Sequence, residues 1–361
     1  IVADMQNRIG PNRAGKWGLL QSLADGIKLF FKEQSIPDSA DRPVFRLAPY
    51  LSIIPAFLAF SVVPLGGVVE IAGHTTYVQL ADLPIGVLFV LAMSGLGVYG
   101  IMLAGWASGS KYPLLGAVRA SAQMISYEAA LGLSIVGVLI HTGTLSTRGI
   151  VDAQAWHGWD SIGEWFFVAA PVPFVIFVIA MIAETNRAPF DLVEAEQELV
   201  GGFHTEYTGI RFAIFFLAEY MNMVTMSAIA VTLFLGGPAG PHIPFLTPMW
   251  PVVWFISKVC LFLFLYIWLR AALPRLRYDH LMDLGWRVLI PVAVLWLGVA
   301  SVFRIARDQD WDAWVYIVTP MGALVLYGML LACMPPRNSG VTVRPQGPAL
   351  GPALRPAEVD A

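Results

Sequence analysis

The sequence contains little charge and almost no cysteine. Charged residues make up 13% of the 361 residues, whereas a soluble domain typically has about 25%. The two cysteines, Cys260 and Cys333, lie far apart inside apolar runs, and no Cys/His cluster with metal-ligand spacing occurs. We therefore expect no disulfide framework, no zinc site and no iron–sulfur cluster on this chain. The net charge of only −3 argues against a nucleic-acid-binding surface.

Long hydrophobic runs take the place of the missing charge. Hydrophobic residues make up 57% of the chain, and the mean hydropathy is +0.67. Only helices and closed barrels satisfy the backbone polar groups in lipid, and these runs are too long for barrel strands. The sequence therefore predicts an all-α polytopic membrane protein without strands. Its eight expected spans are 48–66, 83–106, 114–141, 164–183, 211–235, 251–270, 287–304 and 312–333.

The distribution of basic residues predicts how these spans are oriented. Loops on one side of the membrane carry 18 of the 22 Lys and Arg residues, loops on the other side carry three, and Lys258 lies inside a span. Because basic residues accumulate on the cytoplasmic side, both ends of the chain and the loop 184–210 are predicted to be cytoplasmic.

The cytoplasmic segment 1–47 contains an amphipathic helix, expected over 17–32. Leu23 and Ile27 belong to its apolar face, and Asp25 belongs to the opposite polar face. Such a helix, too short in its apolar run to cross a membrane, lies in the interface. Two interpretations stay open, a plain surface anchor and a helix that shapes a lateral opening for a lipid-soluble ligand.

The predicted helix bundle spans 48–333, and the segment 334–361 that follows is rich in Pro and Gly. This composition is typical of a disordered cytoplasmic tail. The chain begins with Ile1 rather than Met, and its charged first residues do not form a signal peptide.

One motif in the second span has a misleading pattern. SGLGVYG contains GxGxxG at Gly95, Gly97 and Gly100, but no strand precedes it, so it is not a dinucleotide fingerprint. Glycines inside a membrane span are typical of close helix packing. We expect no NADH or flavin site on this chain.

Acidic residues gather in the stretch AETNRAPFDLVEAEQELVGGFHTEY, residues 183–207. Six of the 25 acids in the chain lie there beside a single base, Arg187. The acids are Glu184, Asp191, Glu194, Glu196, Glu198 and Glu206. Such a cluster is unfavourable unless it is hydrated, protonated or paired. It could dock a basic partner, or it could pass protons toward the membrane.

Ionisable residues inside the predicted spans indicate a function, because charge is costly in lipid. Glu128 lies in the third span, where Arg119, Gln123 and Tyr127 form a polar stripe. Glu219 and Lys258 are further ionisable residues inside predicted spans. Carboxylates leading from the acidic loop into the membrane could carry protons or respond to a nearby charge.

Four long stretches carry a resemblance to a known family. They are QNRIGPNRAGKWGLLQSLADGIKLFFKE, GWASGSKYPLLGAVRASAQMISYE, the acidic stretch, and LRAALPRLRYDHLMDLGWRVLIP. In order and spacing the chain resembles, over roughly residues 6–330, the NuoH family. This family is the membrane subunit of bacterial respiratory complex I and the counterpart of mitochondrial NADH dehydrogenase subunit 1.

The resemblance implies a subunit of a proton-pumping NADH:quinone oxidoreductase in the bacterial inner membrane. It would form the quinone chamber, its bilayer entrance and the start of a carboxylate route for protons. The substrate would be ubiquinone or menaquinone, while NADH, FMN and the iron–sulfur clusters would be bound by partner subunits. These partners are the quinone-site and iron–sulfur subunits of the hydrophilic arm, small membrane subunits and antiporter-like subunits, together with lipids.

The resemblance also assigns residues by matching position. For the quinone chamber and entrance they are Arg8, Arg13, Gln21, Asp25, Lys28, Arg187, Phe190, Asp191, Glu194, Glu196, Glu198 and Phe203. For the proton route they are Tyr127, Glu128, Glu184, Glu206, Glu219 and Lys258. Some of the basic residues could instead hold lipid phosphates or neighbouring subunits.

Two departures from the family pattern stand out. Family members have a ninth, N-terminal transmembrane helix before the RIGPN motif, which this sequence lacks, and some carry an acid at the position of Gly95. Two other functions fit the sequence less well. The homologous membrane subunit of an energy-converting hydrogenase is disfavoured by the complete GPNRAGKWGLLQ motif. A stand-alone ion-coupled transporter would show repeat symmetry, and none is evident.

Overall fold

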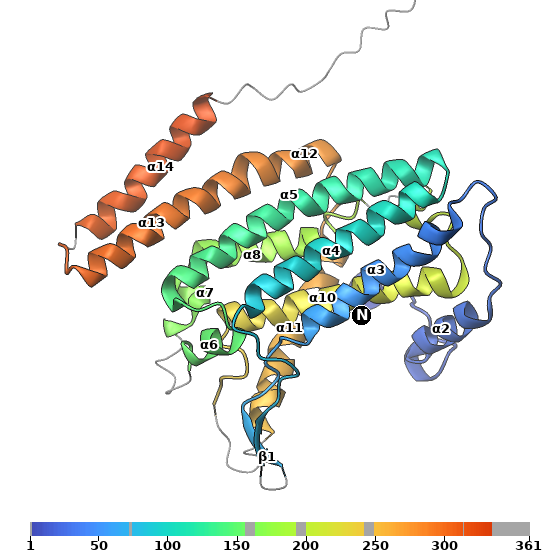
Figure 1. The fold of residues 1–361 in the computed structure, drawn as a ribbon, viewed down its shortest axis with the longest axis horizontal. Coiled ribbons are helices and arrows are strands. Elements are labelled where there is room, and N and C mark those ends of the chain that lie inside the picture. The colour runs from blue at the N-terminus through green and yellow to red at the C-terminus, as the bar shows by residue number, and fades with distance from the viewer. Residues whose placement is uncertain are drawn as a thin grey trace, which may run out of the picture.

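The computed structural model describes residues 2–71, 74–155, 163–192, 200–241, 249–312 and 314–333. Its long helices are α3 (Arg42–Phe60), α4 (Gly86–Ala107), α5 (Lys111–Thr142), α8 (Pro171–Glu184), α10 (Gly209–Phe234), α11 (Trp250–Ala272), α13 (Ile290–Asp308) and α14 (Val315–Cys333). The shorter helices are α1 (Val2–Met5), η1 (Lys16–Gly18), α2 (Gln21–Phe31), α6 (Thr147–Asp152), α7 (Phe166–Ala169), η3 (Gly202–His204), α12 (Tyr278–Asp283) and η5 (Leu284–Leu289). Most of the long helices pack side by side in one bundle, whereas α14 stands away from it beside α13 (Figure 1).

The helical membrane fold predicted from the sequence is confirmed. Within the described ranges, seven helical runs are long and apolar enough to cross a membrane. The remaining predicted span, 164–183, is the fourth in the chain, and it is broken, because α7 ends at Ala169 and α8 begins at Pro171. The backbone of Ala170 is not helical, with φ −133° and ψ 65°, and Pro171 has no N–H to continue a helix. The prediction of one continuous helix over 164–183 is therefore wrong, and α8 keeps 14 residues.

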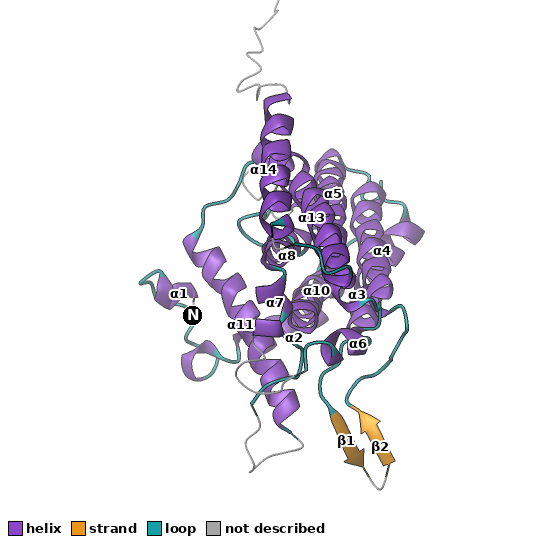
Figure 2. Ribbon diagram, turned by 90° about the vertical axis from the view of Figure 1, so that its left-hand side faces the viewer, coloured by secondary structure: helices purple, strands orange, loops and turns teal. Residues whose placement is uncertain are grey.

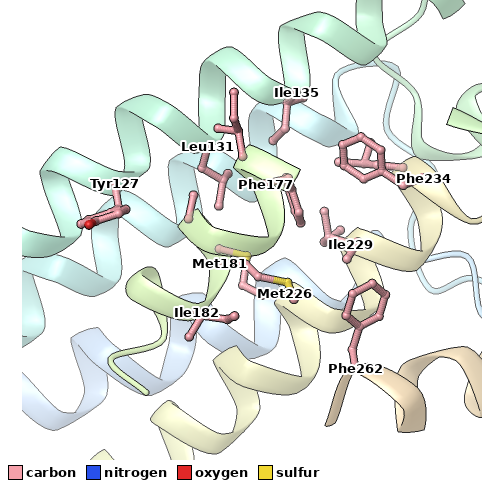
Figure 3. Close-up of a cluster of buried hydrophobic side chains, with 14 of the residues drawn as sticks. Tyr127, Leu131, Ile135, Phe177, Met181, Ile182, Met226, Ile229, Phe234 and Phe262 are labelled. Atoms are coloured by element: carbon pink, nitrogen blue, oxygen red, sulfur yellow. The ribbon is translucent and has the colours of Figure 1, made fainter. Parts of the chain in front are cut away.

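The main hydrophobic core surrounds α8. Figure 3 shows Phe177 and Met181 of α8 between Leu131 of α5 and Ile229 of α10, all of them buried. Phe262 adds a contribution from α11. Residues of α5, α10 and α11 therefore surround α8, and its carboxyl end is held inside the bundle.

A second cluster of buried residues joins the acidic loop to the bundle. Phe203 and Tyr207, near the end of the loop, pack with Phe45 of α3 and Phe215 of α10. The rings of Phe45 and Tyr207 are stacked, with centroids 4.0 Å apart, and the Tyr207 hydroxyl donates to the carbonyl of Phe45 at 3.1 Å. The end of the loop is thus fixed against two helices.

Two strands lie outside the helical bundle, where none was predicted. β1 (Val68–Ile71) and β2 (His74–Tyr77) pair antiparallel, with Val68 opposite Tyr77. Figure 2 shows this hairpin projecting from the end of the bundle. This short hairpin leaves the predicted all-α class unchanged, because the constraint on backbone hydrogen bonds that made strands unlikely applies only inside lipid.

The amphipathic surface helix is shorter than predicted. It was expected over 17–32, but α2 begins at Gln21, because Trp17 and Gly18 have positive φ angles of 59° and 72°. A side chain on Gly18 would collide with the carbonyl group of Pro11, so the turn needs glycine there. The α2 helix lies beside α10, and none of its residues is buried by this chain.

Candidate functional site

Glu184 is buried at the carboxyl end of α8. The residue is 1% exposed, and its Oε1 accepts a hydrogen bond from the Ser94 hydroxyl of α4 at 2.6 Å. Its second oxygen, Oε2, is buried without a hydrogen-bond partner among the described residues. A buried carboxylate oxygen without a partner is costly, which marks this position as a candidate functional group.

Glu128 of α5 lies against Gly95 of α4, the residue that follows Ser94. A Cβ atom placed on Gly95 would lie 2.9 Å from Glu128 Oε1, so the absence of a side chain at this position leaves room for the carboxylate. Since Ser94 binds Glu184, consecutive residues of α4 meet two different acids. The prediction of close helix packing holds at Gly100, where a Cβ would lie 2.8 Å from the backbone nitrogen of Ser52 on α3.

Arg187 and Glu219 form an ion pair at the same end of the bundle. The Arg187 guanidinium is 3.3 Å from Glu219 Oε1 of α10, and the two side chains are 8% and 22% exposed. The guanidinium also lies over the ring of Tyr220, 4.4 Å from its centroid. The loop that follows α8 is thereby tied to α10 by its single base.

A cavity of about 60 Å³ separates Glu184 from Glu219, and both residues line it. Ser52 of α3 also lines it, and the Ser52 hydroxyl is buried without a hydrogen-bond partner in the part of the chain that the structure describes. The other polar residues of the lining are Ser94, Thr185, Asn186, Asn222 and Thr225. This volume has room for a few water molecules, and the polar lining provides partners for them.

Gln123 of α5 fixes the loop between α8 and the acidic segment. Its side-chain nitrogen donates to the carbonyls of Ala183 at 2.8 Å and Phe190 at 2.9 Å. Phe190 in turn packs against the ring of Tyr127, 5.6 Å between centroids, and the Tyr127 hydroxyl donates to the carbonyl of Leu281 at 2.8 Å. The polar stripe predicted on α5 therefore positions the loop that carries Arg187.

The remaining acids of the loop are only partly covered by the structure. Asp191 is partly buried directly after the anchored turn, and Glu206 is partly buried beyond η3. The candidates Glu194, Glu196 and Glu198 lie outside the described residues.

His204 and Tyr207 lie in the aromatic surroundings of the loop end. The His204 ring contacts the rings of Phe203 and Phe212, with centroids 5.1 and 5.2 Å away. Burial lowers the pKa of His204 from 6.5 to about 4, because the charged form loses its hydration. Burial likewise raises the pKa of Tyr207 above its usual value. Both side chains are therefore neutral at pH 7.

The candidates for the quinone entrance lie apart from the cavity lining. Arg8, Arg13, Asp25 and Lys28 are exposed, and Gln21 is partly exposed. The Gln21 side-chain amide donates to Asp25 at 3.2 Å within α2. The structure thus divides the predicted site into an interior group around Glu184 and a surface group on the segment before α3.

Lys258 of α11 lies at the carboxyl end of α10. Its ammonium donates to the carbonyls of Leu235 at 2.6 Å, Gly237 at 3.0 Å and Ala239 at 2.7 Å, and it lies 4.3 Å from the Trp165 ring centroid. These described contacts are those of a helix cap. The proton-route role assigned to Lys258 by the family resemblance stays a prediction.

Several residues that complete the site were not predicted from the sequence. Ser52 and Ser94 line the cavity, and each stands among apolar neighbours in the sequence. A lone Ser or Asn in a span has no pattern that separates a functional partner from a residue bonded to its own helix. The described residues contain no group of three His, Cys, Asp or Glu suited to a metal ion.

The fold and the site together define a polytopic helical membrane protein with ionisable groups inside its bundle. A model of the NADH dehydrogenase family matches residues 1–301. The chain belongs to this family, and the resemblance seen in the sequence is confirmed.

Curated relatives agree with this assignment. The chain is 56% identical over 335 residues to the H subunit of NADH-quinone oxidoreductase from Frankia alni and equally identical to the protein of that name from Frankia casuarinae. Each match covers 92% of this chain and 72% of the relative. A Streptomyces avermitilis protein of the same name is 52% identical over 337 residues, covering 90% of this chain and 72% of the relative.

Proposed function

We propose that this chain is the membrane subunit of a proton-translocating NADH:quinone oxidoreductase that forms the quinone chamber and starts the proton route. The observation that carries the proposal is that buried Glu184 and partly buried Glu219 line one cavity, with partly buried Glu128 beside them against Gly95 of α4. A purely structural bundle has no need for carboxylates inside it, because their burial is costly.

The proton would move through the cavity. Glu184 lines the cavity, with one oxygen fixed by Ser94 and Oε2 without a described partner, so a rotation of the carboxyl group would bring Oε2 to water in the cavity. Water there can also reach Glu219, since both acids line the same space. Arg187 stabilises the ionised form of Glu219 at 3.3 Å. A charge change near Arg187 would therefore alter which acid holds the proton.

The quinone would enter between the surface segment and the loop. The apolar face of α2 is exposed, as expected of a helix at the membrane surface, and α2 lies beside α10. The chamber wall would come from Arg187, Phe190, Asp191 and Phe203, with Glu194, Glu196 and Glu198 on the adjoining loop. Reduction of the quinone would change the charge beside Arg187 and so couple electron transfer to proton movement.

Electrons would arrive from NADH through FMN and iron–sulfur clusters on partner subunits. We place the complex in the bacterial inner membrane, with the loop 184–210 and both chain ends in the cytoplasm. The basic residues concentrated on that side support this orientation. The partners would be the hydrophilic arm, small membrane subunits and antiporter-like subunits.

The test is Glu184→Gln in the assembled complex. Gln keeps the shape and can still accept from Ser94, but it cannot bind and release a proton. We expect proton translocation and quinone reduction to fall at least about tenfold, which corresponds to about 1.4 kcal/mol. Electron transfer from NADH to an artificial acceptor at the flavin should stay unchanged.

The control is Glu164→Gln, because Glu164 is exposed. This variant should match the unsubstituted protein in all three assays. Unchanged quinone reduction and proton translocation in Glu184→Gln would overturn the proposed route. A copurifying hydrogenase in place of NADH-oxidising subunits would overturn the assignment to this enzyme.

A further inference from the structure

Helix α8 ends at a left-handed residue that is not glycine. Asn186 has a φ of 52°. The backbone N–H of Arg187 donates to the carbonyl of Ile182 at 3.2 Å. The N–H of Asn186 donates to the carbonyl of Ala183, also at 3.2 Å. These two bonds define a Schellman cap with Asn186 at its left-handed position. The chain therefore leaves the helix within one residue, and Arg187 is the first residue beyond the turn.

The same cap occurs a second time, after α1. Asn7 also has a φ of 52°. The N–H of Arg8 donates to the carbonyl of Ala3 at 2.9 Å. The N–H of Asn7 donates to the carbonyl of Asp4 at 3.1 Å. Asn7 is exposed, whereas Asn186 is buried. Asparagine thus ends both helices in the same way, and the two caps differ in what surrounds the side chain.

The side chain of Asn186 packs against α5. Its Oδ1 accepts from Gln123 Nε2 at 3.3 Å, and its Nδ2 lies 3.7 Å from the sulfur of Met124. The same Gln123 nitrogen donates at 2.8 and 2.9 Å to the carbonyls of Ala183 and Phe190. That nitrogen has two hydrogens, so its bond to Asn186 is the weakest of the three and adds little stability. The enclosed side chain instead restricts the rotation of the turn, which glycine would leave free.

Two charged groups lie on either side of this turn. Glu184, two residues before Asn186, accepts a hydrogen bond from Ser94 of α4. Arg187, the next residue after it, lies 3.3 Å from Glu219 of α10 and is 8% exposed. Asn186 itself lines the cavity that Glu184 and Glu219 also line. A change in the backbone angles of the turn would therefore move the guanidinium relative to both carboxylates.

We propose that Asn186 is a positioning residue, which holds the Arg187 guanidinium toward Glu219 by restricting the turn at the end of α8. Its amide neither binds nor releases a proton near neutral pH, so it acts through Arg187 and not as a member of the proton route. Its effect on catalysis rests on the proposed function, in which the charge opposite Glu219 affects proton movement. A cap alone would not need the buried amide, since glycine is the usual residue at this position.

The test is Asn186→Gly in the assembled complex. Glycine adopts the left-handed conformation readily and can keep both backbone bonds, while Gln123 keeps its two carbonyl acceptors. We therefore expect normal assembly. A map from electron cryomicroscopy should show the Arg187 guanidinium displaced from Glu219. Quinone reduction should fall about fivefold, because a small misplacement of a charged group slows a reaction strongly.

Asn7→Gly is the matched control, because it makes the same substitution at the same φ in an exposed cap. It should leave quinone reduction unchanged. A double variant, Asn186→Gly with Glu219→Gln, then measures whether the two residues act together. If Asn186 acts through Arg187 and its contact with Glu219, the double variant should be no slower than Glu219→Gln alone. A merely structural role would make the two losses multiply.

Three results would overturn the positioning role. The first is an Arg187 guanidinium that remains 3.3 Å from Glu219 in the map of Asn186→Gly. The second is a pair of losses that multiply in the double variant. The third is failure of Asn186→Gly to assemble, which would make the side chain a structural support.

The map separates this inference from the proposed function. A displaced Arg187, together with unchanged quinone reduction in both Asn186→Gly and Glu219→Gln, would confirm the positioning role and remove the proposed proton route.

Discussion

The carboxyl ends of α8 and α10 both bury polar groups, but they treat them differently. At the end of α10, Gln154 donates to the carbonyls of Ile150, Thr232 and Leu233 and accepts from the backbone N–H groups of Phe166 and Gly236. Lys258 donates to three further carbonyls beside it. Every donor of these two side chains is used.

At the end of α8, buried polar atoms share a cavity instead of a closed network. Glu184 Oε2 and Ser52 Oγ have no hydrogen-bond partner among the described residues, and both residues line the cavity. A fully bonded network contributes to stability, whereas a partly satisfied one is costly and is retained where chemistry needs it. The comparison contrasts a bonded network around the end of α10, which we expect to hold the fold, with a cavity at the end of α8, which is the candidate site.

Lys258→Met should break the closed network and have the largest effect. Met has a similar length but no donor, so three carbonyls lose their partner, at about 1–3 kcal/mol for each group left buried and unpaired. We expect little assembled protein and a lower unfolding temperature in detergent, measured by yield and thermal denaturation. Ser257→Ala, at an exposed neighbour on the same helix, is the control. Normal assembly with proton translocation lost would instead place Lys258 on the proton route.

Glu219→Gln should leave the fold intact and impair quinone reduction, because it changes the cavity at the carboxyl end of α8. It removes the charge that faces Arg187 at 3.3 Å, so the guanidinium loses a charged partner. We expect quinone reduction to fall about tenfold, equivalent to about 1.4 kcal/mol, while assembly is retained. Asp308→Asn removes one partner of an exposed pair with Arg304 and should change nothing. Equal activity of both variants would remove Glu219 from the route.

Gly95→Ala should test whether the position of the Glu128 carboxylate affects proton translocation, without changing any ionisable residue. The new methyl group would lie 2.9 Å from Glu128 Oε1 and displace the carboxylate. We expect proton translocation to fall a few-fold, with stability nearly unchanged because Ala favours a helix more than Gly. Gly298→Ala in α13 is the control, since a Cβ there also meets nothing within 4 Å and Gly298 lies outside the cavity lining. If both variants pump alike, the position of Glu128 does not matter.

His204 should give the smallest effect at neutral pH, because its contribution is visible only in acid. Its folded pKa of about 4 lies below its ordinary value of 6.5, so the unfolded state binds the proton more readily. The stability contributed by neutral His204 is present above pH 6.5 and is lost as the pH falls toward 4, by no more than about 3 kcal/mol. Thermal unfolding between pH 7 and pH 4 would show it, and His204→Gln should flatten that part of the profile. An unchanged profile in this variant would contradict the assignment.

Much of the fold could be read from the sequence, and less of the site. Hydrophobic length located the spans, because about 20 apolar residues are needed to cross lipid. It missed the break at Ala170, since apolar content says nothing about a backbone turn that Pro171 permits. Glu128 and Glu219 stood out as charges in apolar runs, whereas Ser52 and Ser94 did not. Their importance depends on which atoms they face across helices.

The sequence by itself determined that this chain is a helical membrane protein of the NADH dehydrogenase family. The apolar composition indicates that the helices lie in lipid, and long motifs in fixed order identify the family. Only the tertiary structure decided that Glu184 lies beside Ser94 and that Arg187 pairs with Glu219. It also decided that Lys258 caps α10. These contacts join residues far apart in the chain, and helix packing, which no local pattern encodes, brings them together.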